Sequence, residues 1–359
     1  MSLPHPDTVD RVMRILSEEH LEILKMRMIK ALLNKKALHK HRLQQKWFVV
    51  AIDGSGIVSF DHPHCENCLY KTSKRGKTTW FHNVLEAKLI TENGFALSLA
   101  TEWIENPSGS FDKQDCERKA FNRLAAKLKS DFSRLPICLT ADSLYPYKGF
   151  FDVCGKYGWR YILTFKDGSL PSVWEEVEAL KPLMESNRRR ERIVRGKKRI
   201  EKDIQWVVNI DYKGCIIHWI ECIETVDAPG QESQQRRFVH LTDFEIDYRN
   251  ALEISATGRL RWKIENEGFN AQKNQGYNLS HKYARKSCRA MKNYYQGLQM
   301  AHIINQLLNL SQNFQELLEG KMTAKHLWKR LECLMSDGDV DEQEIEAVNS
   351  TRFQIRFVT

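Results

Sequence analysis

The stretch Val49-Val-Ala-Ile-Asp-Gly54 places an aspartate directly after a run of apolar residues that begins at Trp47. A continuous apolar run of this length is typical of a central strand that is buried on both faces. The segment Asp53-Gly-Ser-Gly56 is then expected to form a turn at the end of that strand. Ile137-Cys-Leu-Thr-Ala-Asp142 repeats the pattern, since a second apolar run again ends in an aspartate. The two stretches predict two buried strands, each with a carboxylate at its end.

The segments around these strands predict a mixed α/β sheet. Strand-like runs follow at 78–90, 94–101 and 160–165, and helical patterns at 113–130 and 147–157. Three strands, a helix, a strand, a helix and a strand indicate a mixed sheet with helices on its faces. Ligands of such sheets bind at the ends of central strands. Asp53 and Asp142 are therefore the first two candidate site residues.

A third stretch, Arg261-Trp-Lys-Ile-Glu-Asn-Glu-Gly-Phe-Asn270, predicts an amphipathic helix. Arg261 and Glu265 are four residues apart and share one helix face. Trp262 and Phe269 are seven apart and are expected to share an apolar face that packs inward. A carboxylate held ionised by a guanidinium is a good ligand for a hard cation. Taken by itself, the stretch is better explained as an amphipathic helix that carries a salt bridge.

The positive charge of the chain is concentrated in one block. The 359 residues carry a formal net charge of +9, and residues 181–202 alone hold ten Lys and Arg against three Glu. Such a block is expected for a polyphosphate partner, with a solvated charge run as the alternative. The centre of the block consists of Arg188, Arg189, Arg190 and Arg192. A second basic stripe is expected on a helix over 280–310 and includes Lys282, Arg285 and Arg289.

Membrane and extracellular classes are disfavoured by composition. No apolar run approaches the roughly 20 residues of a membrane span, and the N-terminal residues lack the apolar core of a signal peptide. Nine cysteines, an odd number spread over a long chain, argue against a disulfide framework. We expect an intracellular protein with reduced thiols and no membrane partner.

Changes of pattern along the chain predict five regions. Paired strands at 204–212 and 215–225 follow the basic block, around a turn at Tyr212-Lys-Gly214. The predicted regions are an N-terminal helical region at 1–46, the first part of the core at 47–169, a β-rich basic insert at 170–258, the closing helices of the core at 259–310, and a helical and acidic tail at 311–359.

Two aspartates at strand ends, followed by a glutamate on a helix beyond a β-rich insert, resemble the DDE transposases of bacterial insertion sequences. The resemblance covers about residues 47–305 and is most specific in the Arg261-Trp-x-Ile-Glu265 segment. It implies a catalytic core like those of ribonuclease H and retroviral integrase. More narrowly, the chain is similar to the cut-and-paste branch, in which a β-strand insert separates the second Asp from the Glu.

That branch carries a Tyr, Arg, Glu, Lys signature with spacings of two, three and six residues. Arg261 and Glu265 match it, but the Tyr position falls on Gly258 and the Lys position on Gln272. Lys273 comes one residue late and can take the Lys role only if the helix is locally shifted. Glu267 is a competing carboxylate, about 200° away from Glu265 on a helix, so that only one of the two can face the aspartates.

The resemblance implies that Asp53, Asp142 and Glu265 hold two Mg²⁺ or Mn²⁺ ions, cleave DNA strands at the element ends and join them to target DNA. Two ions activate the attacking water and stabilise the leaving oxygen of an in-line displacement. Arg261, Lys273 and the basic residues named above would contact DNA phosphates. We expect double-stranded DNA as partner, a homodimer on DNA, and a cytoplasmic, nucleoid-associated location in bacteria. Two alternatives are a nuclease of the same fold that cuts without joining, and a non-catalytic DNA-binding derivative.

His64-Cys-Glu-Asn-Cys68 contains a Cys-x-x-Cys pair beside a histidine. Structural zinc requires four nitrogen or sulfur ligands, and such a tight pair is typical of one end of the site. Cys65 and Cys68 are therefore candidate zinc ligands, with His82 and Cys116 as further ones. The alternative is plain packing of inert thiols, and it is favoured for Cys116, which is expected on the buried stripe of the helix at 113–130.

Overall fold

The structure is a computed structural model and describes residues 4–109, 113–318 and 322–337, together with positions 341, 343, 346, 347, 350 and 357. The chain divides into two compact units. One is Met26–Gly276, and the other combines Met1–Lys25 with Tyr277–Thr359. All strands of the main sheet belong to the Met26–Gly276 unit.

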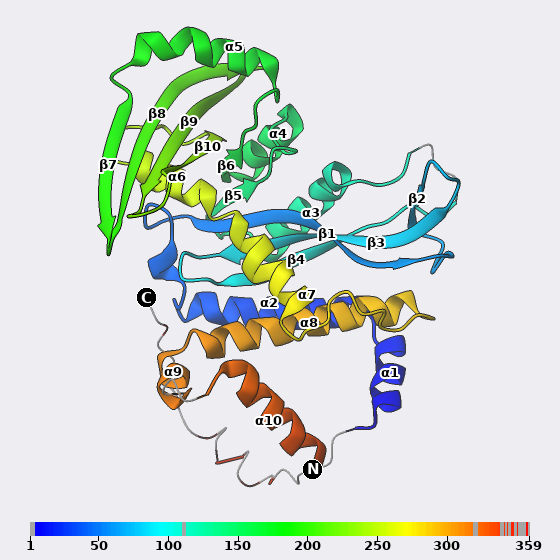
Figure 1. The fold of residues 1–359 in the computed structure, drawn as a ribbon. Coiled ribbons are helices and arrows are strands. Elements are labelled where there is room, and N and C mark those ends of the chain that lie inside the picture. The colour runs from blue at the N-terminus through cyan, green and yellow to red at the C-terminus, as the bar shows by residue number, and fades with distance from the viewer. Residues whose placement is uncertain are drawn as a thin grey trace. The chain divides into compact units, whose positions relative to one another are not determined.

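This unit is built on a 10-stranded mixed sheet, in the order β2-β3-β1-β5-β6-β10-β9-β8-β7, with β4 paired to β3 (Figure 1). β1 is antiparallel to β3 and parallel to β5, β5 is parallel to β6, and the later strands are antiparallel. The strands are β1 Phe48–Phe60, β2 Leu69–Thr72, β3 Thr78–Ile90, β4 Ala96–Ile104, β5 Ile137–Ala141, β6 Arg160–Thr164, β7 Arg188–Arg195, β8 Lys198–Tyr212, β9 Cys215–Asp227 and β10 Gln234–Thr242. The prediction of a mixed α/β sheet flanked by helices is confirmed at this level.

The two apolar runs form adjacent central strands. Every residue of β5 is buried, as is β1 from Phe48 to Ile52. The turn predicted at 53–56 is wrong, because β1 continues to Phe60. Asp53 pairs with Glu86 of β3, and Gly56 pairs with Asn83, so the long neighbouring strand keeps this glycine-containing segment extended.

Helix α3 (Glu117–Asp131) packs on β3 and β4, and its buried residues are Ala120, Phe121, Leu124, Ala125 and Leu128. Cys116 is the N-cap of this helix and is exposed. The expectation that Cys116 belongs to the buried stripe of the helix is therefore wrong, because the helix begins at Glu117, one residue after Cys116. Helix α4 (Lys148–Tyr157) follows β5, and α6 (Ala251–Arg259) lies against β6, β8, β9 and β10 (Figure 1).

The predicted β-rich insert extends the same sheet. The hairpin predicted at Tyr212-Lys-Gly214 is confirmed, since Tyr212 pairs with Cys215 and both Lys213 and Gly214 have positive φ. This geometry is that of a tight two-residue hairpin turn. Helix α5 (Pro171–Leu180) was not predicted. It begins with Pro171 and buries Val173 and Val177. Two apolar positions give too short a pattern to predict a helix from the sequence.

A buried ionic pair lies on β3, between β1 and β4. Glu86 and Lys88 on β3 are both fully buried, with Lys88 Nζ 3.9 Å from Glu86 Oε2. Ser98 and Thr101 of β4 donate hydrogen bonds to the two carboxylate oxygens of Glu86. Lys88 Nζ also lies 5.3 Å from the ring centroid of Phe269. The carboxylate and the ammonium group therefore each have polar or aromatic neighbours, as buried charges require.

The described part of the other unit consists mainly of helices. It contains α1 (Pro6–Ile15), α8 (Cys288–Asn309), α9 (Gln312–Leu318) and α10 (Ala324–Asp337), and α2 (Glu18–Asn34) begins in it. Asn293 on α8 donates to the backbone oxygens of Met13 and Leu16, which ties α1 to α8. Of the acidic tail residues, Asp339, Glu342 and Glu344 lie outside the described part of the chain.

The helix predicted over 280–310 begins only at Cys288. Ser287 is its N-cap, and its side chain accepts a hydrogen bond from the backbone N–H of Ala290. Lys282 and Arg285 precede the helix and do not share a helical stripe with Arg289, so this part of the prediction is wrong. None of the helices in the described part of the chain has both the length and the hydropathy that a bilayer span requires.

Candidate active site

Asp53 and Asp142 lie at equivalent positions of neighbouring parallel strands. Ala51 of β1 pairs with Thr140 of β5, and each aspartate follows two residues later. Neighbouring strands are about 4.8 Å apart, and residues two apart point to the same face. The register therefore brings both carboxylates together on one face, as expected from the two apolar runs. Asp142 Oδ1 accepts the backbone N–H of Leu144, which turns the chain away after β5.

Arg261 links Asp53 to Glu265. Its Nη1 lies 2.8 Å from Glu265 Oε1 and 3.8 Å from Asp53 Oδ2. Because both distances start from the same nitrogen, Asp53 Oδ2 and Glu265 Oε1 cannot be further apart than the sum of the two distances. That sum is below the limit of about 10 Å that we set for carboxylates sharing two metal ions. Glu267 instead pairs with Lys263, at 2.7 Å. The preference for Glu265 over Glu267 agrees with this arrangement.

The prediction that Trp262 and Phe269 both pack inward from the Glu265 helix is correct for only one of them. Phe269 is buried, but Trp262 is 52 % exposed. The guanidinium carbon of Arg261 lies 5.2 Å from the Trp262 ring centroid. The Trp262 ring therefore lies beside the guanidinium, and Phe269 packs against β3 through Lys88.

Glu265 lies on a π-helical segment, η3 (Ile264–Asn270), which continues into α7 (Ala271–Asn274). A π turn takes about one residue more than an α turn, and such segments occur frequently at functional sites. The segment therefore shifts the following residues by about one position relative to Glu265. Lys273, one residue late in the sequence, donates a hydrogen bond to Ser55 Oγ at 3.0 Å, two residues from Asp53. Gln272 is fully buried instead.

The Tyr position of the signature has no room for a side chain. Gly258 on α6 is buried, and a Cβ atom there would collide with the imidazole of His240 on β10. Burial and the nearby cations Arg259 and Arg261 lower the pKa of His240 to about 4. A neutral imidazole therefore fills the space between helix and sheet beside Arg261.

Glu117 is a fourth carboxylate of the site that was not predicted from the sequence. It occupies the first turn of α3, where its side chain lies so close to Gly54 that any Cβ there would collide with it. Tyr145 Oη lies 3.4 Å from Glu117 Oε2. Burial, and next the carboxylate of Asp142, raise the pKa of Glu117. The only signals in the sequence are an acidic residue at a helix start and a glycine directly after Asp53.

The electrostatics of the cluster favour a bound cation. Burial raises the pKa of Asp53 from 3.8 to about 7; Arg261 lowers it, and Glu265, Glu117 and Asp142 raise it further. Asp53 thus has one neighbouring cation, Arg261, and three neighbouring carboxyl groups. A divalent cation with oxygen ligands would favour the ionised form of Asp53, so the donor chemistry suits Mg²⁺ or Mn²⁺. In the described part of the chain, the carboxylates do not form a group of three ligand atoms that all lie within 4.8 Å of one another, so the side chains would have to move closer to share an ion. A cavity of about 400 Å³ adjoins Glu117 and is lined by Phe81, Asn83 and Leu144, among others.

The four arginines at the centre of the basic block are engaged within the insert. Arg188 and Arg190 pair with Asp203, and Arg192 pairs with Glu201. Arg189 donates to the backbone oxygens of Tyr248 and Arg249. By contrast, the tip of the β7–β8 hairpin carries four exposed cations without an ion-pair partner in the described part of the chain: Arg195, Lys197, Lys198 and Arg199.

Cys65 and Cys68 lie in the loop after β1, close to His82 on β3. His82 pairs with Val58, five residues from Asp53 along β1, which corresponds to roughly 16 Å. The thiols are therefore separate from the carboxylates. Cys116 does not belong to the His/Cys groups that the described side chains form.

No protein-family model matches the chain, and no curated protein matches it in sequence.

The pKa of Asp53 predicts how the metal-free protein responds to pH. Because the folded pKa of about 7 lies above the unfolded value of 3.8, the stability that protonated Asp53 contributes is present below about pH 4 and lost as pH rises to about 7. Relative to Asp53→Asn, the free energy of unfolding of the wild type should fall across this window by a few kcal/mol, at about 1.4 kcal/mol per pKa unit. Chemical denaturation at stepped pH in EDTA measures this difference.

The control is Asp61→Asn, which removes a carboxylate that is 77 % exposed and should leave the pH dependence of the wild type unchanged. Addition of Mg²⁺ at pH 8 should stabilise the wild type and not Asp53→Asn. A constant difference between wild type and Asp53→Asn from pH 4 to 7 would contradict the burial argument.

Proposed function

We propose that the protein is a DNA transposase of the DDE type, which cleaves DNA strands at the ends of an insertion sequence and joins them to target DNA. The proposal rests on one observation: the guanidinium of Arg261 contacts the carboxylates of both Asp53 and Glu265. Asp142 lies beside Asp53 in the register of β1 and β5. These residues come from three distant parts of the chain in the order that the DDE resemblance requires.

The strand arrangement supports a ribonuclease H-like core. In the order β4-β3-β1-β5-β6, the first three strands are antiparallel, and β5 and β6 run parallel to β1. The insert enters after β6 and returns to Glu265 through α6, as in the cut-and-paste branch that the sequence resembles. Lys273 beside Ser55 supports its assignment to the Lys position of the signature.

The chemistry follows from the roles of the side chains. Mg²⁺ bound by the carboxylates would activate the attacking oxygen and stabilise the leaving oxygen. Asp53 must lose its proton to act as a ligand, and Arg261 favours that ionised form. Arg261 also fixes the position of Glu265 through their ion pair. Lys273, which donates a hydrogen bond to Ser55 Oγ, would contact a phosphate next to the reacting one.

We assign the main role in DNA contact to the tip of the β7–β8 hairpin. Its exposed cations form no ion pair in the described part of the chain, so they can bind phosphate without first breaking one. These residues are Arg195, Lys197, Lys198 and Arg199. Arg188, Arg190 and Arg192 would have to break ion pairs to bind phosphate. A homodimer on DNA and a nucleoid-associated location in bacteria remain parts of this proposal.

Cleavage and joining can be tested with a plasmid that carries the coding region with its flanking DNA. Asp53→Asn, Asp142→Asn and Glu265→Gln should each lower Mg²⁺-dependent cleavage by about 10³-fold or more, because each removes several kcal/mol of transition-state stabilisation. DNA binding measured by mobility shift should persist. The matched control is Glu267→Gln, whose carboxylate pairs with Lys263 and which should stay within a few-fold of wild type.

A product joined to a second plasmid identifies strand transfer, and cleavage without it would identify a nuclease of the same fold. DNA binding without any Mg²⁺-dependent cleavage would indicate a non-catalytic derivative. The triad assignment fails if the three variants still cleave, or if Glu267→Gln loses as much activity as they do.

The role of the hairpin tip predicts a change in salt dependence. Replacing Arg195, Lys197, Lys198 and Arg199 with Gln should reduce the slope of log K against log salt by about 0.9 for each phosphate that the protein no longer neutralises. The matched variant replaces Arg188, Arg189, Arg190 and Arg192 with Gln and should reduce the slope less. Circular dichroism checks that both variants are folded. An equal or larger effect of the second variant would assign DNA contact to the paired arginines instead.

A further inference from the structure

A cluster of nitrogen and sulfur ligand atoms lies between the loop after β1 and strand β3. Cys65 and Cys68 come from the loop, and His82 comes from β3, where it is fully buried. Buried Asn106 fixes the loop, since its side chain donates to the backbone oxygen of Cys68 and its own N–H donates to that of Asn67. Two thiols and an imidazole are thus held together by backbone contacts that do not depend on a metal.

The distances between these atoms match the spacing of ligands around one tetrahedral zinc ion. The two Sγ atoms are 3.8 Å apart, and His82 Nε2 lies 3.9 Å from Cys65 Sγ and 3.4 Å from Cys68 Sγ. Zinc bond lengths of about 2.3 Å to sulfur and about 2.05 Å to nitrogen, at tetrahedral angles, require about 3.8 Å between two sulfurs and about 3.5 Å between sulfur and nitrogen.

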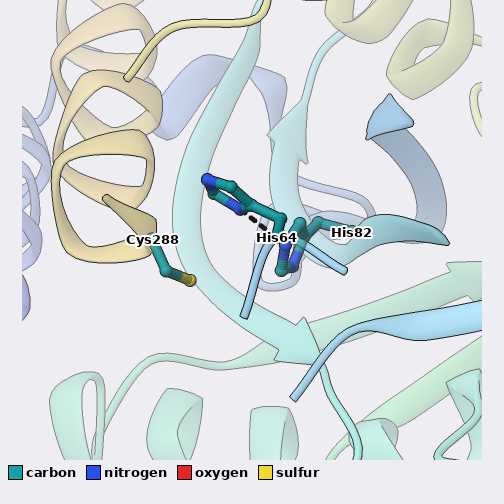
Figure 2. A group of neighbouring side chains, drawn as sticks. All are labelled: His64, His82 and Cys288. Carbon is teal, nitrogen blue, oxygen red and sulfur yellow. Dashed lines mark hydrogen bonds between the residues drawn. The ribbon is translucent and has the colours of Figure 1, made fainter. Parts of the chain in front are cut away.

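His64 is placed to be the fourth ligand. Its Nδ1 lies 3.1 Å from His82 Nε2 (Figure 2), close to the roughly 3.3 Å between two nitrogens on one zinc ion. The ring of His64 is stacked on Phe60, with centroids 4.6 Å apart, which restricts its orientation. The three ligand atoms of Cys65, Cys68 and His82 already lie within 4.8 Å of one another, whereas His64 is within that distance of His82 but not of both sulfurs. Zinc would replace the contact between the two imidazoles, and His64 would have to turn toward the thiols to complete the site.

Two further contacts are typical of a metal site. The backbone N–H of Cys65 donates to Cys68 Sγ at 3.3 Å, a contact that stabilises a thiolate. On the far side of the His82 ring, Glu105 Oε1 lies 3.9 Å from Nδ1. This distance is longer than a hydrogen bond. If it shortened on metal binding, the carboxylate would orient the ring and raise its basicity.

We propose that His64, Cys65, Cys68 and His82 bind one structural Zn²⁺ ion. On binding, the two thiols release their protons to solvent and the imidazoles coordinate as neutral ligands. Four protein ligands close the coordination sphere, so the ion holds the loop on β3 and does not activate water. The site is independent of the carboxylates, which prefer Mg²⁺.

The experiment measures metal content and coordination and does not require DNA. Protein purified from zinc-supplemented cells should contain one zinc per chain by elemental analysis, and Cys65→Ser with Cys68→Ser should contain less than a tenth of that. The matched control, Cys116→Ser with Cys333→Ser, replaces two exposed thiols and should retain one zinc.

Cobalt titration of metal-free wild type tests the site even if the double variant fails to fold. One equivalent of Co²⁺ should give the absorption bands of a tetrahedral ion with thiolate ligands, and Zn²⁺ should displace it. His64→Ala should weaken Co²⁺ binding at least tenfold while retaining the thiolate bands.

Absence of zinc and of tetrahedral cobalt bands, or zinc retained by the Cys65→Ser with Cys68→Ser variant, would overturn the proposal. So would a Cys65–Cys68 disulfide in protein purified without oxidant. Failure of DNA cleavage would leave the zinc measurements unaffected, so that the two proposals can fail separately.

Discussion

The candidate active site depends on one guanidinium group among carboxylates. Arg261 is 7 % exposed and lies between Asp53 and Glu265. Burial makes the ionised form of Asp53 unfavourable, and the neighbouring Glu265, Glu117 and Asp142 make it more so. The single positive charge cannot offset all of these carboxylates, so a cation is the simplest way to make the cluster stable in its ionised form.

The sheet beneath the cluster explains how these residues are held. Asp53 pairs with Glu86, and Glu86 pairs with Thr101, so that one row of polar residues crosses β1, β3 and β4. Lys88 lies beside Glu86 and also packs against Gly268 and Phe269 of the η3 segment. The polar row is therefore connected to the helical segment that carries Glu265. A shift of that segment would disturb both the buried ion pair and the carboxylate cluster.

The sequence patterns were sufficient where they depended on local rules. The apolar runs before Asp53 and Asp142 predicted two buried strands, and the four-residue spacing predicted the Arg261–Glu265 ion pair. They were insufficient where long-range packing decides. The exposure of Trp262 and the approach of Glu117 to Gly54 depend on how helices meet the sheet, which no short pattern records. The late position of Lys273 became understandable only with the π-helical segment, because the spacing of the signature assumes a regular α-helix.

The most direct test of the central claim, that the carboxylates around Arg261 bind divalent cations, is anomalous X-ray scattering from a crystal equilibrated with Mn²⁺. This ion prefers the same oxygen ligands as Mg²⁺. We expect anomalous density among Asp53, Asp142 and Glu265, with Glu117 close by, and loss of that density in Asp53→Asn crystals. Mn²⁺ bound elsewhere in the crystal, with none at these carboxylates, would contradict it.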